Sequence, residues 1–192
     1  MNKVQPTLNR LVFLALGLSA NLMTAQAGPD QANHIAQTPA ALPCVDISTL
    51  TTRTTPVEMY SAVHKCIDDH QYDKASRLFA VAGVYGRFDT QRVADESAHQ
   101  ILPALRAGLF SQLDEESKRA FQDAAKPYSA GASGLTDLCA QIRKLGPPSY
   151  EPTYMTSHGL SATTGTGGGL IPGFDAAKAW QFSLTNYLNC PG

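Results

Sequence analysis

Apolar residues recur at intervals of three and four positions through most of the chain after residue 55, which is the spacing of one face of an α-helix. Met59, Val63, Cys66 and Ile67 form the first such stripe. Just before it, residues 55–58 read Thr-Pro-Val-Glu, a capping box with proline at the first helical position. No stretch alternates apolar and polar residues in a way that requires a β-strand. The pattern therefore predicts a mainly α protein.

A second apolar stripe follows and completes an antiparallel helical hairpin. It spans residues 75–82, and Gly83 and Gly86 predict its end. Further helices are expected over residues 89–106, 113–126, 136–145 and 175–188. Asp89 is the expected cap of the first of these, and Pro103 should bend or divide it because proline lacks a backbone donor. The result is a single bundle of about five or six helices.

The stretch 146–173, near the C-terminus, forms a long loop without helical periodicity. Loops beyond about 12–15 residues in compact domains are usually functional or disordered. Its first half carries Tyr150, Tyr154, Met155 and His158 in and after a run of prolines. We predict that these four residues bind a partner, because aromatic and methionine side chains on an exposed loop are typical interface anchors. The alternative is that they fold back and cover the core. The second half, rich in Ser, Thr and Gly, predicts a flexible flap.

The N-terminal residues 1–27 have the three parts of a secretory signal peptide. Lys3 and Arg10 give a positive start, an apolar run follows over residues 11–23, and a small-x-small cleavage pattern ends at Ala27. The apolar run is too short and too interrupted to span a bilayer comfortably. We therefore expect a protein that is periplasmic or secreted after cleavage near Ala27.

The remainder divides into a short arm and one domain. Residues 28–43 are rich in Gln, Ala, Pro and Asn and predict a flexible arm, whereas residues 44–192 predict a single α-helical domain. The whole chain has a formal net charge of −1. Loss of the signal peptide removes the positive charges of Lys3 and Arg10, which leaves −3. A mildly acidic chain without basic clusters indicates no nucleic-acid partner. No second apolar run of spanning length follows, so we expect no stable membrane insertion.

All four cysteines lie in the predicted domain, and an even number in an exported chain predicts two disulfides. Four cysteines allow three pairings, and the sequence leaves the choice open. We favour Cys44–Cys66 with Cys139–Cys190, because each bridge then ties an irregular segment or a chain end to a helix. A zinc site is the alternative, but no two cysteines have the close spacing of a zinc knuckle. The disulfides should staple the bundle together.

Three groups of residues have side chains that could carry chemistry. His64 and Asp68 share a helix face at a spacing that can grip a divalent metal, but no third ligand accompanies them. Asp95 and His99 have the same spacing, which lets a carboxylate orient an imidazole, and His158 lies in the long loop. No matching nucleophile is identifiable, and the glycine run of the loop lacks the Lys-Ser/Thr of a phosphate-binding loop. We therefore assign no catalytic residue, no metal and no cofactor.

Two stretches resemble something more particular than a generic helix. Residues 66–89 contain Cys-Ile, Tyr-Asp-Lys-Ala, Leu-Phe and Tyr-Gly at a spacing similar to a tetratricopeptide-like repeat, of which one copy is visible. Residues 138–159 begin Leu-Cys-Ala-Gln-Ile-Arg-Lys-Leu-Gly-Pro-Pro and continue through the two tyrosines and the histidine of the loop. Together they resemble small exported proteins of Gram-negative bacteria, some of which are similar to immunity partners of secreted antibacterial effectors. The resemblance implies a protein partner and carries over no functional residue.

The leading functional hypothesis is a non-enzymatic periplasmic binding or inhibitor protein, an immunity protein that neutralises a toxin or hydrolase by docking on it directly. This hypothesis rests on three observations: the predicted export, the lack of an identifiable catalytic set, and the long loop that carries aromatic residues. One alternative is a small periplasmic hydrolase that uses His158 or the Asp95/His99 pair. Another is a structural helical module of an envelope complex. The oligomeric state stays open.

Overall fold

The computed structural model describes residues 41–166 and 168–191. The predicted signal peptide and most of the predicted arm lie outside these residues. The α-helices are α1 (Pro56–Asp68), α2 (Tyr72–Arg92), α3 (Ile101–Ser111), α4 (Glu115–Ala125), α5 (Ser133–Leu145), α6 (Thr153–Thr156), α7 (Gly159–Thr164) and α8 (Ala176–Phe182). Short turns of other helix types are η2 (Ile47–Thr49), η3 (Glu96–Gln100), η4 (Lys126–Tyr128) and η5 (Ser183–Tyr187). The described residues form no strand beyond one isolated bridge, so the mainly α prediction is confirmed.

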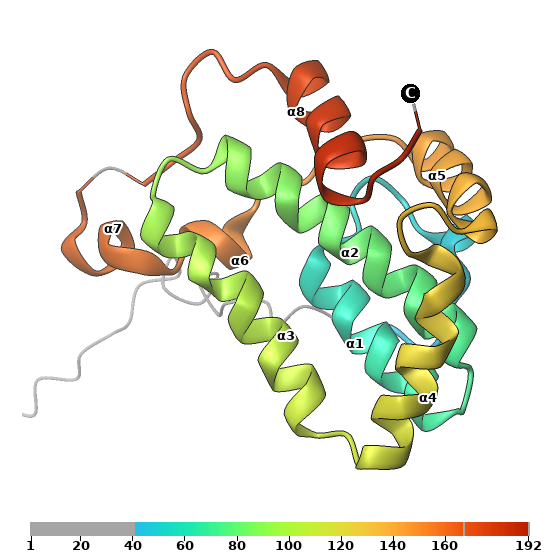
Figure 1. Cartoon of the computed structure of the whole chain (residues 1–192). Coiled ribbons are helices and arrows are strands. Elements are labelled where there is room, and N and C mark those ends of the chain that lie inside the picture. The colour runs from blue at the N-terminus through green and yellow to red at the C-terminus, as the bar shows by residue number, and fades with distance from the viewer. Residues whose placement is uncertain (1–40, 167, 192) are drawn as a thin grey trace, which may run out of the picture. The chain divides into compact units, whose positions relative to one another are not determined.

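Helix α2 is the central element and packs against α1, α4 and α8 (Figure 1). Helices α1 and α2 form the antiparallel hairpin that their apolar stripes predict. Met59 and Val63 of α1 are fully buried. The predicted capping box is present, because the Glu58 N–H donates to Thr55 Oγ1 at 3.3 Å and the Thr55 N–H donates to Glu58 Oε2 at 2.7 Å. Local capping and apolar spacing thus agree at this helix.

Helix α2 does not end at Gly83 and Gly86, as the sequence predicted, but continues to Arg92. Both glycines make room for other elements instead. A Cβ atom at Gly83 would overlap the Tyr187 hydroxyl group, and one at Gly86 would lie 2.8 Å from Leu102 Cδ2. Glycine inside a helix costs about 1 kcal/mol relative to alanine, and close tertiary packing outweighs that cost here.

The third predicted helix, 89–106, is also corrected by the structure. Asp89 caps no helix, because it lies buried within α2. The chain leaves helical geometry at Val93, passes through η3 and enters α3 at Ile101. Pro103 therefore lies in the first turn of α3, where its missing N–H and fixed φ are tolerated. It does not divide the helix.

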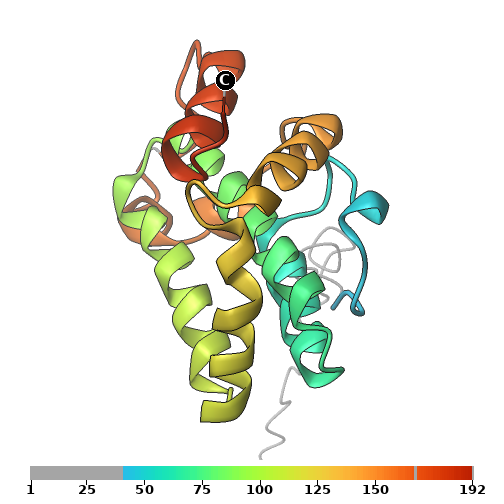
Figure 2. The same cartoon turned by 45° about the vertical axis from the view of Figure 1, so that its right-hand side comes forward.

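Helices α3 and α4 are joined by a short turn and lie side by side in the lower part of both views (Figures 1 and 2). Phe79 of α2, Phe110 of α3 and Phe121 of α4 meet edge to face, with ring centroids 5.5 to 5.8 Å apart. Aromatic rings prefer this arrangement over a stacked sandwich. The aromatic cluster therefore ties the α3–α4 pair to the central helix.

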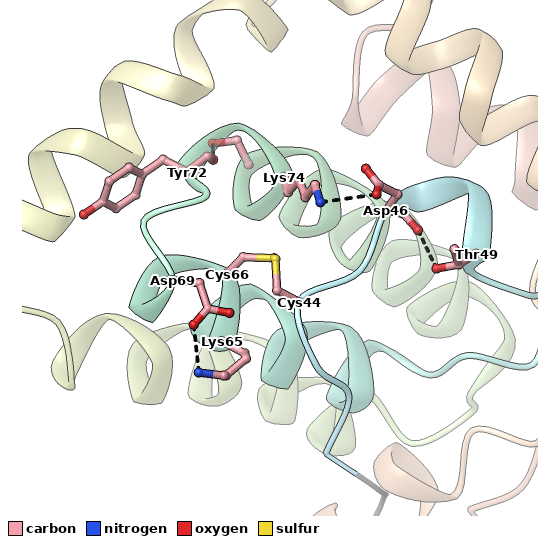
Figure 3. The surroundings of a disulfide bond; sticks show 9 residues. Cys44, Asp46, Thr49, Lys65, Cys66, Asp69, Tyr72 and Lys74 are labelled. Atoms are coloured by element: carbon pink, nitrogen blue, oxygen red, sulfur yellow. Dashed lines mark hydrogen bonds and ion pairs between the residues drawn. A yellow bond between two sulfur atoms is a disulfide. The ribbon is translucent and has the colours of Figure 1, made fainter.

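Both disulfides have the pairing that we favoured, Cys44–Cys66 and Cys139–Cys190. The first ties the segment before η2 to α1, and the second ties the C-terminal end to α5. Figure 3 shows the first bridge and, beside it, the Lys74 amino group 3.3 Å from the Asp46 carboxylate, which joins the same segment to α2. In the chain-entropy model, closing a loop of 51 residues stabilises the fold by about 4 kcal/mol.

The C-terminal part confirms two predicted boundaries and adds two unpredicted helices. Helix α5 ends at Leu145, and its C-cap is Gly146, whose φ of 88° is readily adopted only by glycine. The predicted last helix is present as α8 and continues as the π-helical turn η5. The long loop between them contains α6 and α7, which have no apolar periodicity to predict them. None of the helices in the described part is long and apolar enough to cross a membrane.

Candidate functional site

The first half of the 146–173 loop folds back onto the core. Three of the four predicted partner-binding side chains are buried there: Tyr150 is 8% exposed, Tyr154 9% and Met155 0%. In this structure they cover the core, which is the alternative that the sequence left open, and they offer no free surface to a partner. His158, the fourth, is exposed.

The two tyrosines converge on one buried carboxylate of α2. The hydroxyl groups of Tyr150 and Tyr154 donate to Asp89 Oδ2 at 2.7 and 2.6 Å, and Arg92 Nε donates to Asp89 Oδ1 at 2.8 Å. Burial raises the pKa of Asp89 above its ordinary value, while the Arg92 charge and the tyrosine hydroxyl groups oppose that rise. Burial, reinforced by the Asp89 charge, raises the pKa of Tyr154, so its hydroxyl group keeps its proton. The network fastens the loop to α2.

The sequence divided the loop after Leu160, but in the structure the change in its surroundings comes at His158, just before α7. The second half of the loop, counted from His158 to residue 173, is fixed by hydrogen bonds of its main chain. The Leu160 N–H donates to Ser97 Oγ and the Ser161 N–H donates to Asp95 Oδ2, both at 2.8 Å. Gly159 allows this approach, because its φ is 83° and a Cβ atom there would lie 2.8 Å from Asp95 Oδ2. The start of α7 is therefore held against the segment between α2 and α3.

The residues after the glycine run are attached to the same segment. The Ala94 N–H donates to the Gly169 carbonyl oxygen at 3.0 Å, and the Ile171 N–H donates to the Arg92 carbonyl oxygen at 2.8 Å. These two bonds flank the isolated bridge to Leu170. The described residues of the predicted flap are thus held by main-chain hydrogen bonds on both sides of residue 167.

This second half presents apolar side chains to solvent. Leu160 is 69% exposed, Ile171 42% and Leu170 38%. We call these three side chains, together with exposed His158, the loop face. Sequence reasoning missed the three aliphatic residues, although a signal was present, since they interrupt an otherwise Ser/Thr/Gly-rich stretch. Figure 1 shows the loop passing through α7 and returning to α8.

The proposed catalytic pair Asp95/His99 does not form in the structure. Asp95 accepts hydrogen bonds from Ser97 and Ser161, which lower the pKa of its carboxyl group. His99 Nε2 instead lies 3.0 Å from the Val93 carbonyl oxygen. Because the two side chains are engaged separately, the carboxylate does not orient the imidazole.

His158 and His64 do not complete a reactive site either. His158 Nδ1 lies 3.3 Å from Ser157 Oγ on the surface, and no described carboxylate is paired with it. His64 Nδ1 lies 3.3 Å from Asp68 Oδ2 on an exposed face of α1. Across the part of the chain that the structure describes, no group of three His, Cys, Asp or Glu residues is arranged to hold a metal.

A cavity of about 650 Å³ lies between α1 and α3. Its lining is mainly apolar and includes Val57, Ile101 and Leu105. At its rim the Leu42 N–H donates to Ser61 Oγ at 2.9 Å, so the chain enters the described part beside this cavity. The lining also contains Tyr60, Ser61, His64 and Lys65. Each is paired with a residue outside this set, and no hydrogen bond joins them to one another. They therefore do not form the convergent set that a reactive site needs.

Comparison of the chain with protein-family models, curated proteins and solved structures finds no match. The protein is therefore described by its own structure, as an α-helical domain with two disulfides and a long loop. The side chains of one half of this loop are buried, and large apolar side chains of the other half are exposed. Because a fold by itself does not specify a function, the function has to be argued from this site.

Proposed function

We propose that this chain is an exported, non-enzymatic binding protein that docks on a protein partner through the loop face. The observation that carries the proposal is the 69% exposure of Leu160 on a helix whose first turn is hydrogen-bonded to Asp95 and Ser97, between α2 and α3. Single exposed leucines are common on protein surfaces. Three large aliphatic side chains on one anchored segment are more typical of a contact surface.

The anchoring favours binding because it lowers the entropic cost of association. A mobile loop must be ordered when a partner binds, at about 0.5–1.5 kcal/mol for each side chain that is immobilised, in addition to the ordering of its main chain. Here four main-chain hydrogen bonds already position the segment. The aliphatic side chains are thus presented before any partner arrives.

The composition of the loop also suits an interface centre. Residues 152–174 contain no Asp, Glu, Lys or Arg. The centres of protein interfaces are depleted in charged residues, because burying a charge without a partner is costly. The complementary surface on the partner should therefore be apolar, with hydroxyl or main-chain groups at its edge to meet the threonines of α7.

We further propose that the partner is a toxin or hydrolase that this protein neutralises in the periplasm, as an immunity protein does. The resemblance of residues 66–89 and 138–159 to small exported proteins of Gram-negative bacteria, some of which are similar to immunity partners, supports this assignment. So do the two disulfides, which are typical of proteins that fold in an oxidising compartment. An uncharged, anchored projection is a suitable shape to occupy an apolar cleft on an enzyme.

The test compares two variants that each add one negative charge at an exposed position. Leu160→Asp changes the loop face, and Ala107→Asp changes the surface of α3. Tagged wild-type protein and the Ala107→Asp variant should capture the same protein from a periplasmic extract. Leu160→Asp should reduce that capture by about tenfold or more, the loss expected at an interface hot spot.

The captured protein is then purified and assayed for hydrolytic or toxic activity. Wild-type protein and Ala107→Asp should inhibit that activity, and Leu160→Asp should not. Circular dichroism of the three proteins controls for folding. Equal capture by the two variants would contradict the loop face as the docking site, and undiminished activity in the wild-type complex would contradict inhibition.

A further inference from the structure

A second cavity, of about 400 Å³, shares no lining residue with the loop face and has a different chemical character. It is formed by α2, the η3–α3 segment and the C-terminal helix α8 with η5. Its lining combines two arginines, one histidine, several neutral polar groups and an apolar wall: Arg87, Thr90, His99, Leu102, Pro103, Arg106, Phe182, Asn186 and Tyr187. Ligand pockets in proteins fall within about 300–1,000 Å³.

The lining contains two guanidinium groups and no carboxylate. Two arginines outside the cavity are neutralised, Arg77 by Asp73 and Arg92 by Asp89, whereas Arg53, Arg119 and Arg143 also form no ion pair with the described residues. Neither pocket arginine forms an ion pair with any residue of the described part. Two like charges around one cavity, without a counter-charge, give it a positive potential in a chain whose net charge is −1.

Arg106 is held in position by neutral groups that leave its charge uncompensated. Its Nε donates to the Tyr60 hydroxyl oxygen at 2.9 Å and its Nη2 donates to the Tyr187 hydroxyl oxygen at 2.8 Å. Its guanidinium carbon also lies 5.6 Å from the centre of the Tyr187 ring. Gly83 permits this arrangement, because a side chain there would overlap Tyr187. The Nη1 group of Arg106 has no acceptor among the described residues.

Arg87 is positioned by an aromatic ring. Its guanidinium carbon lies 5.2 Å from the centre of the Phe182 ring, and its Nη1 donates a long hydrogen bond of 3.4 Å to Thr90 Oγ1. Its other donors have no acceptor within the described residues. Phe182 is 37% exposed, so it gives the cavity an apolar wall that solvent reaches. A planar guanidinium with free donors is suited to a carboxylate or phosphate group.

We propose that this pocket binds a small organic anion. The carboxylate or phosphate group of the ligand is held by Arg87 and Arg106, and its apolar part lies against Phe182, Leu102 and Pro103. Binding supplies the counter-charge that the two arginines lack and covers the exposed face of Phe182. The site is separate from the loop face, so either function stands without the other.

The probes are phenyl phosphate and phenylacetate, which share an aromatic ring and differ in the anionic group, with benzyl alcohol as the neutral control. Binding is followed by NMR titration of the full domain. We expect a Kd of about 1 mM or tighter for at least one anion, with shifts at the Phe182 and Tyr187 signals. Benzyl alcohol should bind at least about tenfold more weakly, since it lacks the charge.

Arg87→Gln should weaken binding of the preferred anion about tenfold or more, because it removes one of the two charges. Arg53→Gln, which removes an exposed arginine outside the pocket, and Leu160→Asp should leave binding unchanged. Arg106→Lys serves as a second test, with an intact NMR spectrum as the folding control, and should also weaken binding. Absence of binding by both anions, or equal binding by Arg87→Gln and Arg53→Gln, would overturn the proposal. Preference for phosphate over carboxylate, or the reverse, then assigns the ligand class.

Discussion

The two halves of the 146–173 loop are adjacent in the chain but are fixed by opposite means. In the first half, the side chains of Tyr150 and Tyr154 are buried and donate hydrogen bonds to Asp89. In the second half, the main chain makes the attachments and leaves Leu160 exposed. The comparison teaches that a loop can be ordered in two ways, and only the second leaves side chains available to a partner.

The two aspartates that anchor the halves also differ electrostatically. Burial raises the pKa of Asp89, and the surrounding donors oppose that rise. Hydrogen bonds from Ser97 and Ser161 lower the pKa of Asp95, which lies near solvent. The Asp89 carboxylate is thus the centre of a buried hydrogen-bond network, whereas the Asp95 carboxylate accepts hydrogen bonds from main-chain groups at the surface.

The largest effect is expected in the first half. Asp89→Ala leaves Arg92 buried without its partner, which should lower the free energy of unfolding by about 3–5 kcal/mol in urea titrations. Asp123→Ala is the matched control, because it removes an exposed aspartate paired with Lys126 and should cost less than about 1 kcal/mol. If Asp89→Ala does not fold, Asp89→Asn gives the same comparison with less disruption. If both variants lose the same free energy of unfolding, the buried network around Asp89 does not stabilise the loop as described.

A smaller effect is expected in the second half. Gly159→Ala places a side chain at a φ of 83°, with its Cβ 2.6 Å from the Ala98 nitrogen. It should destabilise the protein by about 1–3 kcal/mol and speed hydrogen exchange at the Leu160 and Ser161 amides. Gly165→Ala is the control, because its φ is 68° but its Cβ meets nothing within 4 Å. Equal effects of the two changes would mean that the close approach at Gly159 does not hold the loop.

Lowering the pH should affect the two halves of the loop differently. Of the effects predicted for the two halves, this one should change the free energy of unfolding least. The folded pKa of Asp95 is lowered, so its stabilisation is present above the unfolded value of about 3.9 and is lost as the pH falls through the lower folded value. The folded pKa of Asp89 is raised, so its contribution has the opposite sign and is greatest in acid. Amide exchange at Ser161 should therefore accelerate before exchange at Tyr154 as the pH falls. Simultaneous release of both halves, or an unchanged profile in Asp95→Asn, would contradict this assignment.

Much of the helical framework follows from local patterns in the sequence. The stripe of α1 with its Thr55 capping box, the Gly146 terminus of α5 and the last helix were all predicted from short-range signals. The disulfide pairing was favoured for a simple reason, since each bridge fastens a loose segment to a helix, and the structure confirms it. The helix signals depend on residues near one another in the chain, whereas the disulfides join cysteines 22 and 51 positions apart.

The errors arose where partners are distant in sequence. Gly83 and Gly86 suggested a helix end, but their role is set by Tyr187 and Leu102. Asp89 suggested a cap, but two of its partners lie more than 60 positions away in the loop. No periodicity within one element reveals such contacts. For the same reason, the sequence drew attention to the tyrosines, which are buried, and away from the aliphatic residues that reach solvent.

The most direct test of the account is a hydrogen-exchange footprint of the protein alone and in complex with the captured partner. Peptides covering residues 157–171 should become protected in the complex, whereas those covering residues 147–156 should exchange as slowly as before, because the buried network already shields them. Protection confined to another surface, such as the outer face of α4, would contradict the assignment of the loop face as the docking site.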